Sequence, residues 1–272
     1  MLLLLLMAGL VGGFLAGLVG VGGGVVFGPV LFFYFQALGI EDPALTPLTL
    51  GTSLLCTLCA ALSGTVGQWR AGAIAWRTAL VAGAVAAVAV TAMGLLVTTQ
   101  PWYSKQVFQG VLATVLLVVV ARMLLKREAR DTLSTAGARR GAGVLAATGA
   151  SAGAVAAAAG VGGGVVLVPA FNTLLRLPLK VAAGTSTAAI VLISLSGVLV
   201  YGLEGMGVPG RPLAALGYVD ALHGAALALP AVLTAGWGVK TAHRINVRWV
   251  QVAFALLAFV VAVRLIWNVL AG

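Results

Sequence analysis

Long apolar stretches follow one another along almost the whole chain, and they constrain its fold more than any other feature of the sequence. A stretch of about 20 apolar residues can cross roughly 30 Å of hydrocarbon as a helix. Only 16 Lys and Arg and 6 Asp and Glu occur among 272 residues. A water-soluble domain of this length needs many more charges to cover its surface. The sequence therefore predicts an all-α membrane protein with several membrane crossings.

The net charge of +10 has a different meaning in a membrane protein than in a soluble one. In a soluble protein it would suggest nucleic-acid binding, but in membrane proteins basic residues gather in cytoplasmic loops. We therefore expect a lipid bilayer as a partner and no nucleic acid. Cys56 and Cys59 lie within one apolar stretch without a neighbouring His or acidic residue. They make a poor metal site, so we expect no metal and no cofactor.

One glycine-rich motif occurs twice, which indicates an internal duplication. The sequence Gly-Val-Gly-Gly-Gly-Val-Val begins at Gly20 and again at Gly160, and a proline follows each copy at the same distance. Gly51-Thr52-Ser53 likewise recurs as Gly184-Thr185-Ser186. Motifs repeated in the same order predict two homologous units. The chain then divides into a first transmembrane repeat over 1–125, a basic linker over 126–140 and a second repeat over 141–272.

Each repeat contains five apolar segments, of which the second is short. Glycines separate the first segment from the second, so each pair forms either a tight hairpin or a re-entrant element. Because five is an odd number, the second repeat starts on the opposite membrane face, and the repeats are inverted. The expected segments are 2–19, 24–38, 45–68, 77–98 and 104–125, and then 141–159, 164–175, 181–201, 214–236 and 249–270.

The distribution of basic residues predicts the orientation in the membrane. If the 126–140 linker faces the cytoplasm, twelve of the 16 basic residues lie in the linker or in cytoplasmic loops. Only Lys105 and Arg211 then lie in outer loops. Such a bias is typical of multi-pass membrane proteins. We therefore expect a protein of the cytoplasmic (inner) membrane with both termini outside.

The repeated glycines predict a binding site for an anion. They interrupt the helix and leave backbone N–H groups unpaired at the positive end of the next half-helix. Nearby hydroxyls can donate to an anion without bringing a charge into lipid. The alternatives are close helix packing for the glycines and a bond to the preceding turn for the hydroxyls. Asn172, which follows the second short helix, could line the site or simply end that helix. The expected site comprises Gly22, Gly23, Gly24, Thr52, Ser53, Gly162, Gly163, Gly164, Asn172, Thr185 and Ser186.

Four other polar residues are candidates for the transport pathway. Gln68 and Tyr201 occupy equivalent positions in the two repeats and could face the pathway or cap a helix at the interface. Arg122 and Arg264 are also equivalent. Either arginine could attract an anion at an entrance, or its side chain could snorkel to the lipid headgroups.

The glycine motif also resembles a known family. Gly-x-Gly-Gly-Gly, a nearby proline, a short helix and then Gly-Thr-Ser, present in both halves around a basic linker, are similar to the sulfite exporter TauE/SafE family. Here these elements run from Gly20 to Ser53 and from Gly160 to Ser186. The resemblance implies transport of sulfur-containing oxyanions or organosulfonates, such as sulfite or sulfoacetate, across the cytoplasmic membrane.

Together these features predict a transporter, acting as an exporter, of a small anionic substrate of this class. Export is expected because the cytoplasm is negative and the membrane potential drives anions outward. A passive anion channel would use the same ligands and stays open as an alternative. A proton-coupled carrier is another, because Asp220 and His223 lie three residues apart on one helix face and could relay a proton. No other acid–base or nucleophile constellation lies at membrane depth, so an enzyme is not expected.

Overall fold

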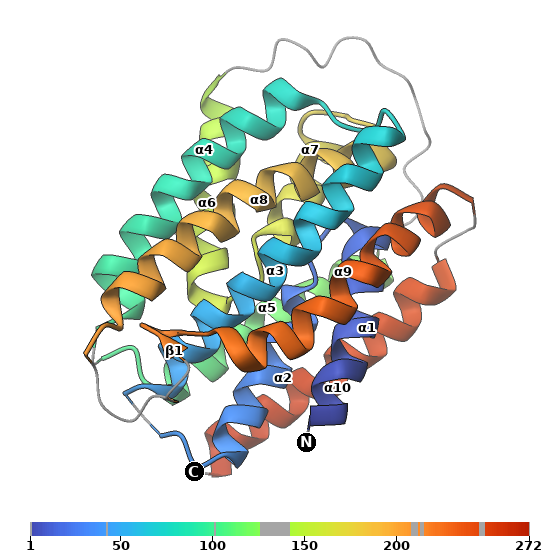
Figure 1. Ribbon diagram of the computed structural model, residues 1–272. Helices are drawn as coiled ribbons and strands as arrows, with labels where there is room; N and C mark the ends of the chain where they lie inside the picture. Colours follow the sequence, from blue (N-terminus) through green and yellow to red (C-terminus); the bar gives the residue numbers. More distant parts are fainter. Residues whose placement is uncertain are drawn as a thin grey trace.

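The computed structural model describes residues 2–41, 43–100, 102–125, 142–207, 212, 215–244 and 248–271. Within them the chain is a bundle of α-helices with one π-helical turn, η1, and one small hairpin (Figure 1). The first half contains α1 (Leu2–Val19), α2 (Gly24–Ala37), α3 (Leu45–Arg70), α4 (Trp76–Met93), η1 (Gly94–Thr98) and α5 (Lys105–Leu125). The second half contains α6 (Ala142–Ala159), α7 (Gly164–Thr173), α8 (Leu179–Glu204), β1 (Ala215–Leu216), β2 (Val219–Asp220), α9 (Ala221–Arg244) and α10 (Arg248–Ala271).

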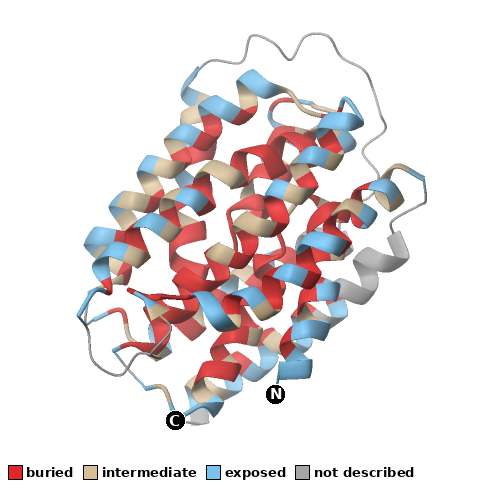
Figure 2. Ribbon diagram, in the orientation of Figure 1, coloured by how far each residue is buried: buried red, intermediate tan, exposed pale blue. Residues whose placement is uncertain are grey.

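In the described part of the chain, six helices are long and apolar enough to cross a bilayer, by length and composition: α1, α3, α4 with η1, α6, α8 and α9. Buried residues fill the interior of the bundle, while many outward-facing residues are exposed (Figure 2). On α9, Leu229, Leu233 and Trp237 follow one another at helical spacing and are 67%, 71% and 67% exposed. An exposed apolar stripe of this kind suits hydrocarbon and not water. The prediction of a multi-pass helical membrane protein is confirmed.

Nine of the ten expected apolar segments match helices whose ends lie within three residues of the predicted ones. The segment expected over 214–236 is wrong at both ends, because α9 spans Ala221–Arg244 and the β1–β2 hairpin occupies the residues before it. The hairpin is fixed to α8, since the N–H of Tyr218 donates to the carbonyl of Tyr201 at 2.8 Å. Hydropathy does not distinguish an apolar hairpin from the start of an apolar helix, which explains the error.

α3 and α8 lie at the centre of the bundle and run antiparallel (Figure 1). A Cβ atom on Gly64, late in α3, would lie 3.1 Å from Cγ2 of Thr187, early in α8. Conversely, a Cβ atom on Gly197, late in α8, would overlap the side chain of Leu54, early in α3. The third helices of the two halves therefore contact each other head to tail.

Two other helix pairs also join the two halves. α1 packs against α9, and α6 against α4. Gly13 of α1 lies directly against the backbone of Ala231, and Gly17 against that of Ala235 one turn later, so α1 and α9 are parallel. The glycines of α6 approach α4 in the same way. Such close backbone approach through small residues is typical of membrane helices. Each pair combines the first helix of one half with the fourth helix of the other.

Candidate functional site

Two glycine hinges separate α1 from α2 and α6 from α7. Hinge 1 is residues 20–23 and hinge 2 is residues 160–163. The first, third and fourth residues of each hinge are glycines in the left-handed region, with φ of 78°, 86° and 77° in hinge 1 and 67°, 72° and 78° in hinge 2. Residues with a side chain rarely adopt this conformation. The two copies of the motif therefore have closely similar backbones that require glycine.

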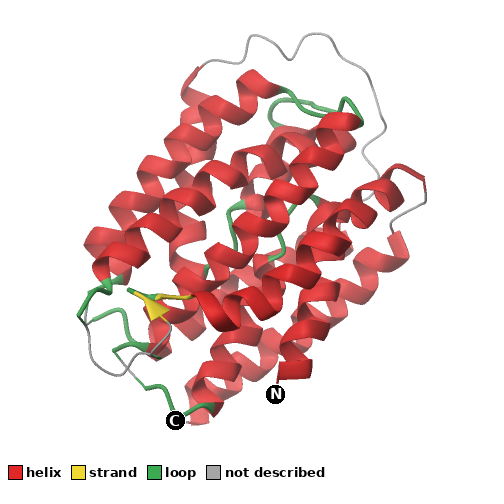
Figure 3. Cartoon of the chain, in the orientation of Figure 1, coloured by secondary structure: helices red, strands yellow, loops and turns green. Residues whose placement is uncertain are grey.

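The two hinges contact each other inside the bundle, where Figure 3 shows two short loop segments surrounded by helices. A Cβ atom on Gly24 would lie 2.6 Å from the carbonyl oxygen of Gly160 and from Cα of Val161. A Cβ atom on Gly164 would lie 2.5 Å from Cα of Val21. The first residue of each short helix therefore touches the opposite hinge, and any side chain there would push the hinges apart.

Several backbone N–H groups in the hinges have no acceptor within the described part of the chain. Among the described residues, the N–H groups of Gly22, Gly23, Gly162 and Gly163 donate to no backbone or side-chain oxygen, and all four residues are buried. Buried backbone donors without a partner are rare in native structures. These donors precede the first turns of α2 and α7, where the helix dipole is positive. The hinges can therefore stabilise negative charge in the protein interior.

Ser53 and Ser186 connect each hinge to the central helix of the other half. Ser53 Oγ on α3 donates to the carbonyl oxygen of Gly160 at 2.8 Å. Ser186 Oγ on α8 donates to the carbonyl oxygen of Gly20 at 3.0 Å. All four residues are buried. The structure thus brings both predicted serines to the hinges, but their hydroxyl hydrogens are used to hold hinge carbonyls.

Thr52 and Thr185 face the starts of two other helices. Thr52 Oγ1 accepts a hydrogen bond from the N–H of Asp220, the residue before α9, at 3.0 Å. Thr185 Oγ1 accepts one from the N–H of Ala75, the residue before α4, also at 3.0 Å. The two threonines therefore play matching parts in the two halves. In this structure each one positions a helix start of the opposite half.

Gln68 and Tyr201 lie near opposite ends of the bundle, late in two antiparallel helices. Gln68 is buried, and its Oε1 lies 3.1 Å from Nε2 of His243 on α9. The Tyr201 hydroxyl donates to the carbonyl of Ala157 at 3.0 Å, and the Thr98 hydroxyl lies 2.6 Å from it. Neither residue caps a helix at the surface. Both are paired with side chains of neighbouring helices.

Asn172 lies at the opposite end of α7 from hinge 2. Its Nδ2 donates to the carbonyl oxygen of Leu177 at 2.9 Å, which closes the turn that follows the helix. The structure therefore does not bring Asn172 to the hinges. The short α7 separates it from them by about 12 Å, at 1.5 Å per residue over the eight residues from Gly164.

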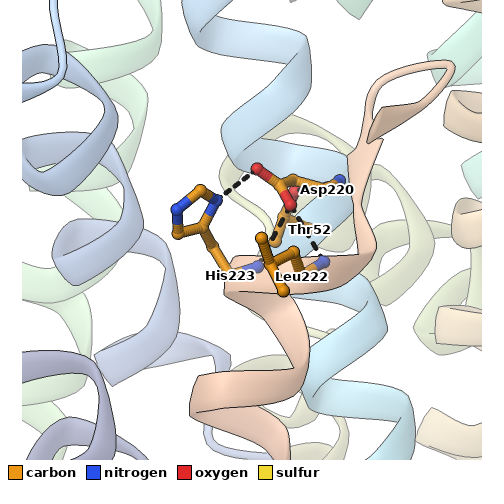
Figure 4. Close-up of polar contacts among 4 residues, drawn as sticks. All are labelled: Thr52, Asp220, Leu222 and His223. Carbon is orange, nitrogen blue, oxygen red and sulfur yellow. Dashed lines mark hydrogen bonds and ion pairs between the residues drawn. The ribbon is translucent and has the colours of Figure 1, made fainter. Parts of the chain in front are cut away.

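Asp220 and His223 form a pair at the start of α9 (Figure 4). Asp220 Oδ1 accepts hydrogen bonds from the N–H groups of Leu222 and His223, at 3.0 and 3.1 Å, so the carboxylate caps the helix. Asp220 Oδ2 lies 2.5 Å from Nδ1 of His223. Asp220 is fully buried, whereas the His223 side chain is 20% exposed and lies beside the Tyr34 ring. The predicted pair is real, and it also has a structural role.

The structure places the side chain of one of the two arginine candidates, Arg264. The guanidinium of Arg264 stacks over the ring of Phe33 on α2, with Cζ 4.9 Å from the ring centroid. This cation–π contact holds an exposed charge against an aromatic face. The side chain of Arg122 lies outside the described residues.

Three buried hydroxyls near the hinges were not predicted from the sequence. The Tyr103 hydroxyl donates to the carbonyl of Ala158, two residues before hinge 2, at 2.7 Å. Burial raises the pKa of Tyr103 above its usual value, so the hydroxyl keeps its proton as a donor. Thr57 and Ser194 are fully buried beside the hinges. Helical spacing along the sequence could have indicated Thr57 and Ser194. Thr57 follows Ser53 by four residues and Ser194 follows Ser186 by eight, so each lies on the same helix face as the serine.

The other clusters among the described residues offer no second site. No three His, Cys, Asp or Glu side chains in the described parts of the chain lie together as metal ligands. Cys56 contacts the carbonyl of Gly224 at 3.4 Å. Two shallow grooves of about 390 and 400 Å³ lie on outer faces, one between α4 and α8 and the other on α5. Neither groove contains a predicted site residue.

Comparison with known proteins settles the family. A model of the family described as "Sulfite exporter TauE/SafE" matches residues 5–265, nearly the whole chain. The chain belongs to the TauE/SafE family. The resemblance seen in the duplicated glycine motif is thereby confirmed, and no solved structure matches this TauE/SafE chain.

Three relatives of this TauE/SafE chain are named as membrane transporters. A "Probable membrane transporter protein" of Haemophilus influenzae is 26% identical over 264 residues, 97% of each chain. A protein of the same description from Methanocaldococcus jannaschii is 25% identical over 252 residues, 92% of this chain and 89% of the relative. The Bacillus subtilis protein YunE is 24% identical over 216 residues, 74% of this chain and 78% of the relative. The TauE/SafE chain is a membrane transporter that works in a lipid bilayer on a small substrate.

Proposed function

We propose that this transporter exports small sulfur-containing oxyanions or organosulfonates, and that the contact between the two hinges binds the anion. The observation that carries the proposal is the set of buried N–H groups of Gly22, Gly23, Gly162 and Gly163, which have no acceptor among the described residues. A bound oxyanion would accept hydrogen bonds from such donors. It would also lie at the positive ends of α2 and α7.

Uncharged donors suit an anion that must enter and leave. A buried lysine or arginine would attract the anion strongly, but its charge would be costly to bury in the empty transporter. Backbone N–H groups at helix starts offer partial positive charge without that cost. This is the way in which discontinuous helices of other transporter folds bind anionic groups.

The hydroxyls of the Gly-Thr-Ser motifs support this site by positioning its parts. Ser53 and Ser186 hold the hinge carbonyls at 2.8 and 3.0 Å, so those oxygens are turned toward the serines. Thr52 and Thr185 fix the residues before α9 and α4. The direct ligands in this proposal are the amides of residues 22–24 and 162–164.

The proposed architecture is a pair of inverted repeats, residues 1–125 and 141–272, joined by the basic linker 126–140. Three observations support it. The equivalent helices α3 and α8 run antiparallel, as inversion requires. In the pairs α1–α9 and α6–α4, the first helix of each half packs against the fourth helix of the other half. Ser53 and Ser186 make the same bond in opposite directions between the halves.

The short helices support the re-entrant form of each glycine-interrupted pair. α2 has 14 residues and α7 has 10, which corresponds to about 21 and 15 Å at 1.5 Å per residue. Neither length reaches the roughly 30 Å of a bilayer core. In each pair the first helix would then enter the membrane from one face, and the short helix would return to that face.

The proposed orientation follows from the basic residues. Twelve of the 16 Lys and Arg residues fall on the side of the linker, which favours a cytoplasmic position for that side and termini outside the inner membrane. Figure 1 supports a shared side for the termini, because the N and C labels lie at the same end of the bundle. Outward movement of an anion would then follow the membrane potential.

A proton-coupled anion carrier is the second candidate function. The observation that favours it is the 2.5 Å contact between Asp220 Oδ2 and His223 Nδ1 in a chain with only 6 acidic residues. A buried carboxylate beside a partly exposed imidazole is a plausible route for a proton. The capping bonds of Asp220 explain the pair equally well, so we place this function second.

A binding screen with the purified protein tests the proposal. Calorimetric titrations with sulfite, sulfate, thiosulfate and methanesulfonate should show saturable binding of at least one anion. In proteoliposomes, preloading with the bound anion should accelerate uptake of its labelled form, as in a carrier. Rapid labelled uptake without this counterflow would indicate the channel. Absence of binding and of flux for all four anions would overturn the proposed substrate class.

A further inference from the structure

Thr57 of α3 and Ser194 of α8 are fully buried, and their hydroxyls have no hydrogen-bond partner among the described residues. Membrane threonines and serines commonly donate to the carbonyl four residues earlier. Thr49 on the same helix does so, over 2.8 Å to Leu45. A buried hydroxyl without a partner destabilises a fold, and its presence requires an explanation.

Both side chains lie beside the hinges. Cγ2 of Thr57 is 3.1 Å from the position that a Cβ atom would occupy on Gly22 and 2.6 Å from that on Gly162. Ser194 Oγ is 3.8 Å from the same point on Gly162. The Thr57 side chain, through its methyl group, and the Ser194 hydroxyl therefore adjoin glycines whose N–H groups also have no acceptor among the described residues. Donors of two kinds, from the backbone and from side chains, gather where the hinges meet.

The equivalent positions in the two halves carry no hydroxyl. At the spacing that relates Ser53 to Ser186, Thr57 corresponds to Ile190, and Ser194 corresponds to Ala61. Ile190 and Ala61 are fully buried apolar residues, and Ile190 also lies against Gly22. Each half thus has an apolar residue where the other has the unpaired hydroxyl. Packing requirements at these two positions are met without a polar atom.

The surroundings of these hydroxyls favour a singly charged ligand. Within the described part of the chain, no Lys, Arg or His donates a hydrogen bond to a hinge residue, to Thr57 or to Ser194. The cost of removing an ion from water rises steeply with its charge. Uncharged donors offset this cost more readily for one negative charge than for two.

We propose that Thr57 and Ser194 are the side-chain ligands of the anion, and that they donate hydrogen bonds to the oxygens of a singly charged oxyanion such as an alkylsulfonate. The inference rests on the proposed function, since it assigns further ligands to the same hinge site. The bound oxyanion satisfies both hydroxyls and the hinge amides together. Without the ligand, these donors have no partner among the described residues, so binding supplies the acceptors that they lack.

Titration of methanesulfonate into the purified full-length protein tests the assignment. Thr57→Val keeps the shape and removes the hydroxyl, and Ser194→Ala removes the other hydroxyl. Each variant should raise the Kd about tenfold or more, as expected for a lost hydrogen bond to an anion. Thr57→Ser keeps a hydroxyl and should stay within about threefold of the wild type. Thr49→Val, whose hydroxyl is bonded within its own helix, is the matched control and should leave the Kd unchanged.

Melting of the ligand-free variants separates a binding role from a structural one. Removing an unpaired buried hydroxyl should leave the melting temperature unchanged or raise it. A large decrease in melting temperature in Thr57→Val and Ser194→Ala would show that the hydroxyls stabilise the fold, and would overturn the assignment.

The binding results distinguish the inference from the proposed function. If the wild type binds methanesulfonate and both variants bind it equally well, the assignment of Thr57 and Ser194 is wrong and the hinge site stands. If the wild type binds sulfate more tightly than methanesulfonate, the assignment of a singly charged ligand is wrong. If the wild type binds none of the sulfur oxyanions, the proposed function fails and the inference fails with it.

Discussion

Ser53 on α3 donates a hydrogen bond of 2.8 Å to the carbonyl oxygen of Gly160, a residue 107 positions later in the chain. Ser186 and Gly20 form the matching bond at 3.0 Å. Each half of the transporter therefore holds the hinge of the other half with one serine hydroxyl. The two bonds link the helix breaks to the central helices, so a displacement of α3 or α8 would act directly on the proposed anion site.

Ser53→Ala should destabilise the protein and weaken transport. The substitution leaves the Gly160 carbonyl buried without its donor, which costs about 1–3 kcal/mol. Thermal unfolding in detergent should show this loss, and flux in proteoliposomes should decrease because hinge 2 is less firmly held. Ser151→Ala is the control, because Ser151 is exposed and bonds only within its own helix. Equal stability of the two variants would contradict the role given to Ser53.

Gly164→Ala should disrupt the contact between the hinges. The added Cβ atom would lie 2.5 Å from Cα of Val21, and this backbone atom can move only if the hinges separate. We expect a cost of about 1–3 kcal/mol in stability, typical of overpacking, together with loss of anion binding. Gly110→Ala on α5 is the matched control, because no atom lies within 4 Å of its added Cβ. That change should be neutral or slightly stabilising, since alanine favours a helix. A stable Gly164→Ala variant with unchanged Kd would show that the hinge contact is not part of the anion site.

A cysteine introduced at Ser134 in the basic linker should be protected from an impermeant thiol reagent in intact cells. The reason is the excess of basic residues in the linker and in the loops expected on its side, which predicts a cytoplasmic linker. The experiment uses a background with Cys56 and Cys59 replaced by alanine, and labelling after cell lysis confirms that the site can react. Rapid labelling in intact cells would show that the proposed orientation is inverted.

Asp220→Asn should leave the fold and outward transport intact. Asparagine caps helices about as well as aspartate, so the bonds to Leu222 and His223 at the start of α9 can persist. The membrane potential alone supplies about 2.3 kcal/mol per charge per 100 mV for an outgoing anion. Flux in proteoliposomes with an imposed potassium diffusion potential should therefore persist in the variant. Flux that follows a pH gradient, ignores the potential and disappears in Asp220→Asn would favour proton coupling instead.

The same residue has a structural contribution that Asp220→Ala would expose. Alanine offers no acceptor to the first turn of α9, and loss of an N-cap side chain costs about 0.5–2 kcal/mol. The alanine variant should melt below the asparagine variant by an amount of this order. If the two variants melt together, the cap seen at Asp220 contributes little to stability.

The helices themselves could be predicted from the sequence because the bilayer limits the possible structures. Backbone groups in hydrocarbon must be paired within their own segment, so an apolar stretch of sufficient length forms a helix. The exception, the region before α9, shows the limit of this rule. Tyr218 is held by the carbonyl of Tyr201 at the end of α8, and hydropathy contains no information about that contact.

The hinges could also be predicted, but the roles of the hydroxyls could not. Consecutive glycines break a helix whatever surrounds them, and the left-handed φ values of Gly22 and Gly162 follow from local chemistry. Whether a hydroxyl meets a carbonyl, an N–H group or no partner depends on which helix lies opposite. Ser53 meets Gly160, whereas Thr57, one turn later, meets no partner among the described residues.

The sequence by itself thus determined that this protein is a helical membrane transporter with two copies of one helix break. It could do so because hydropathy, glycine and charge act locally along the chain. Only the tertiary structure decided that the two breaks touch and that Asp220 caps α9. It also decided that Thr57 and Ser194 lie beside the breaks with hydroxyls that have no partner among the described residues. These features arise where helices of the two halves pack together, and the geometry of that packing depends on residues more than 100 positions apart.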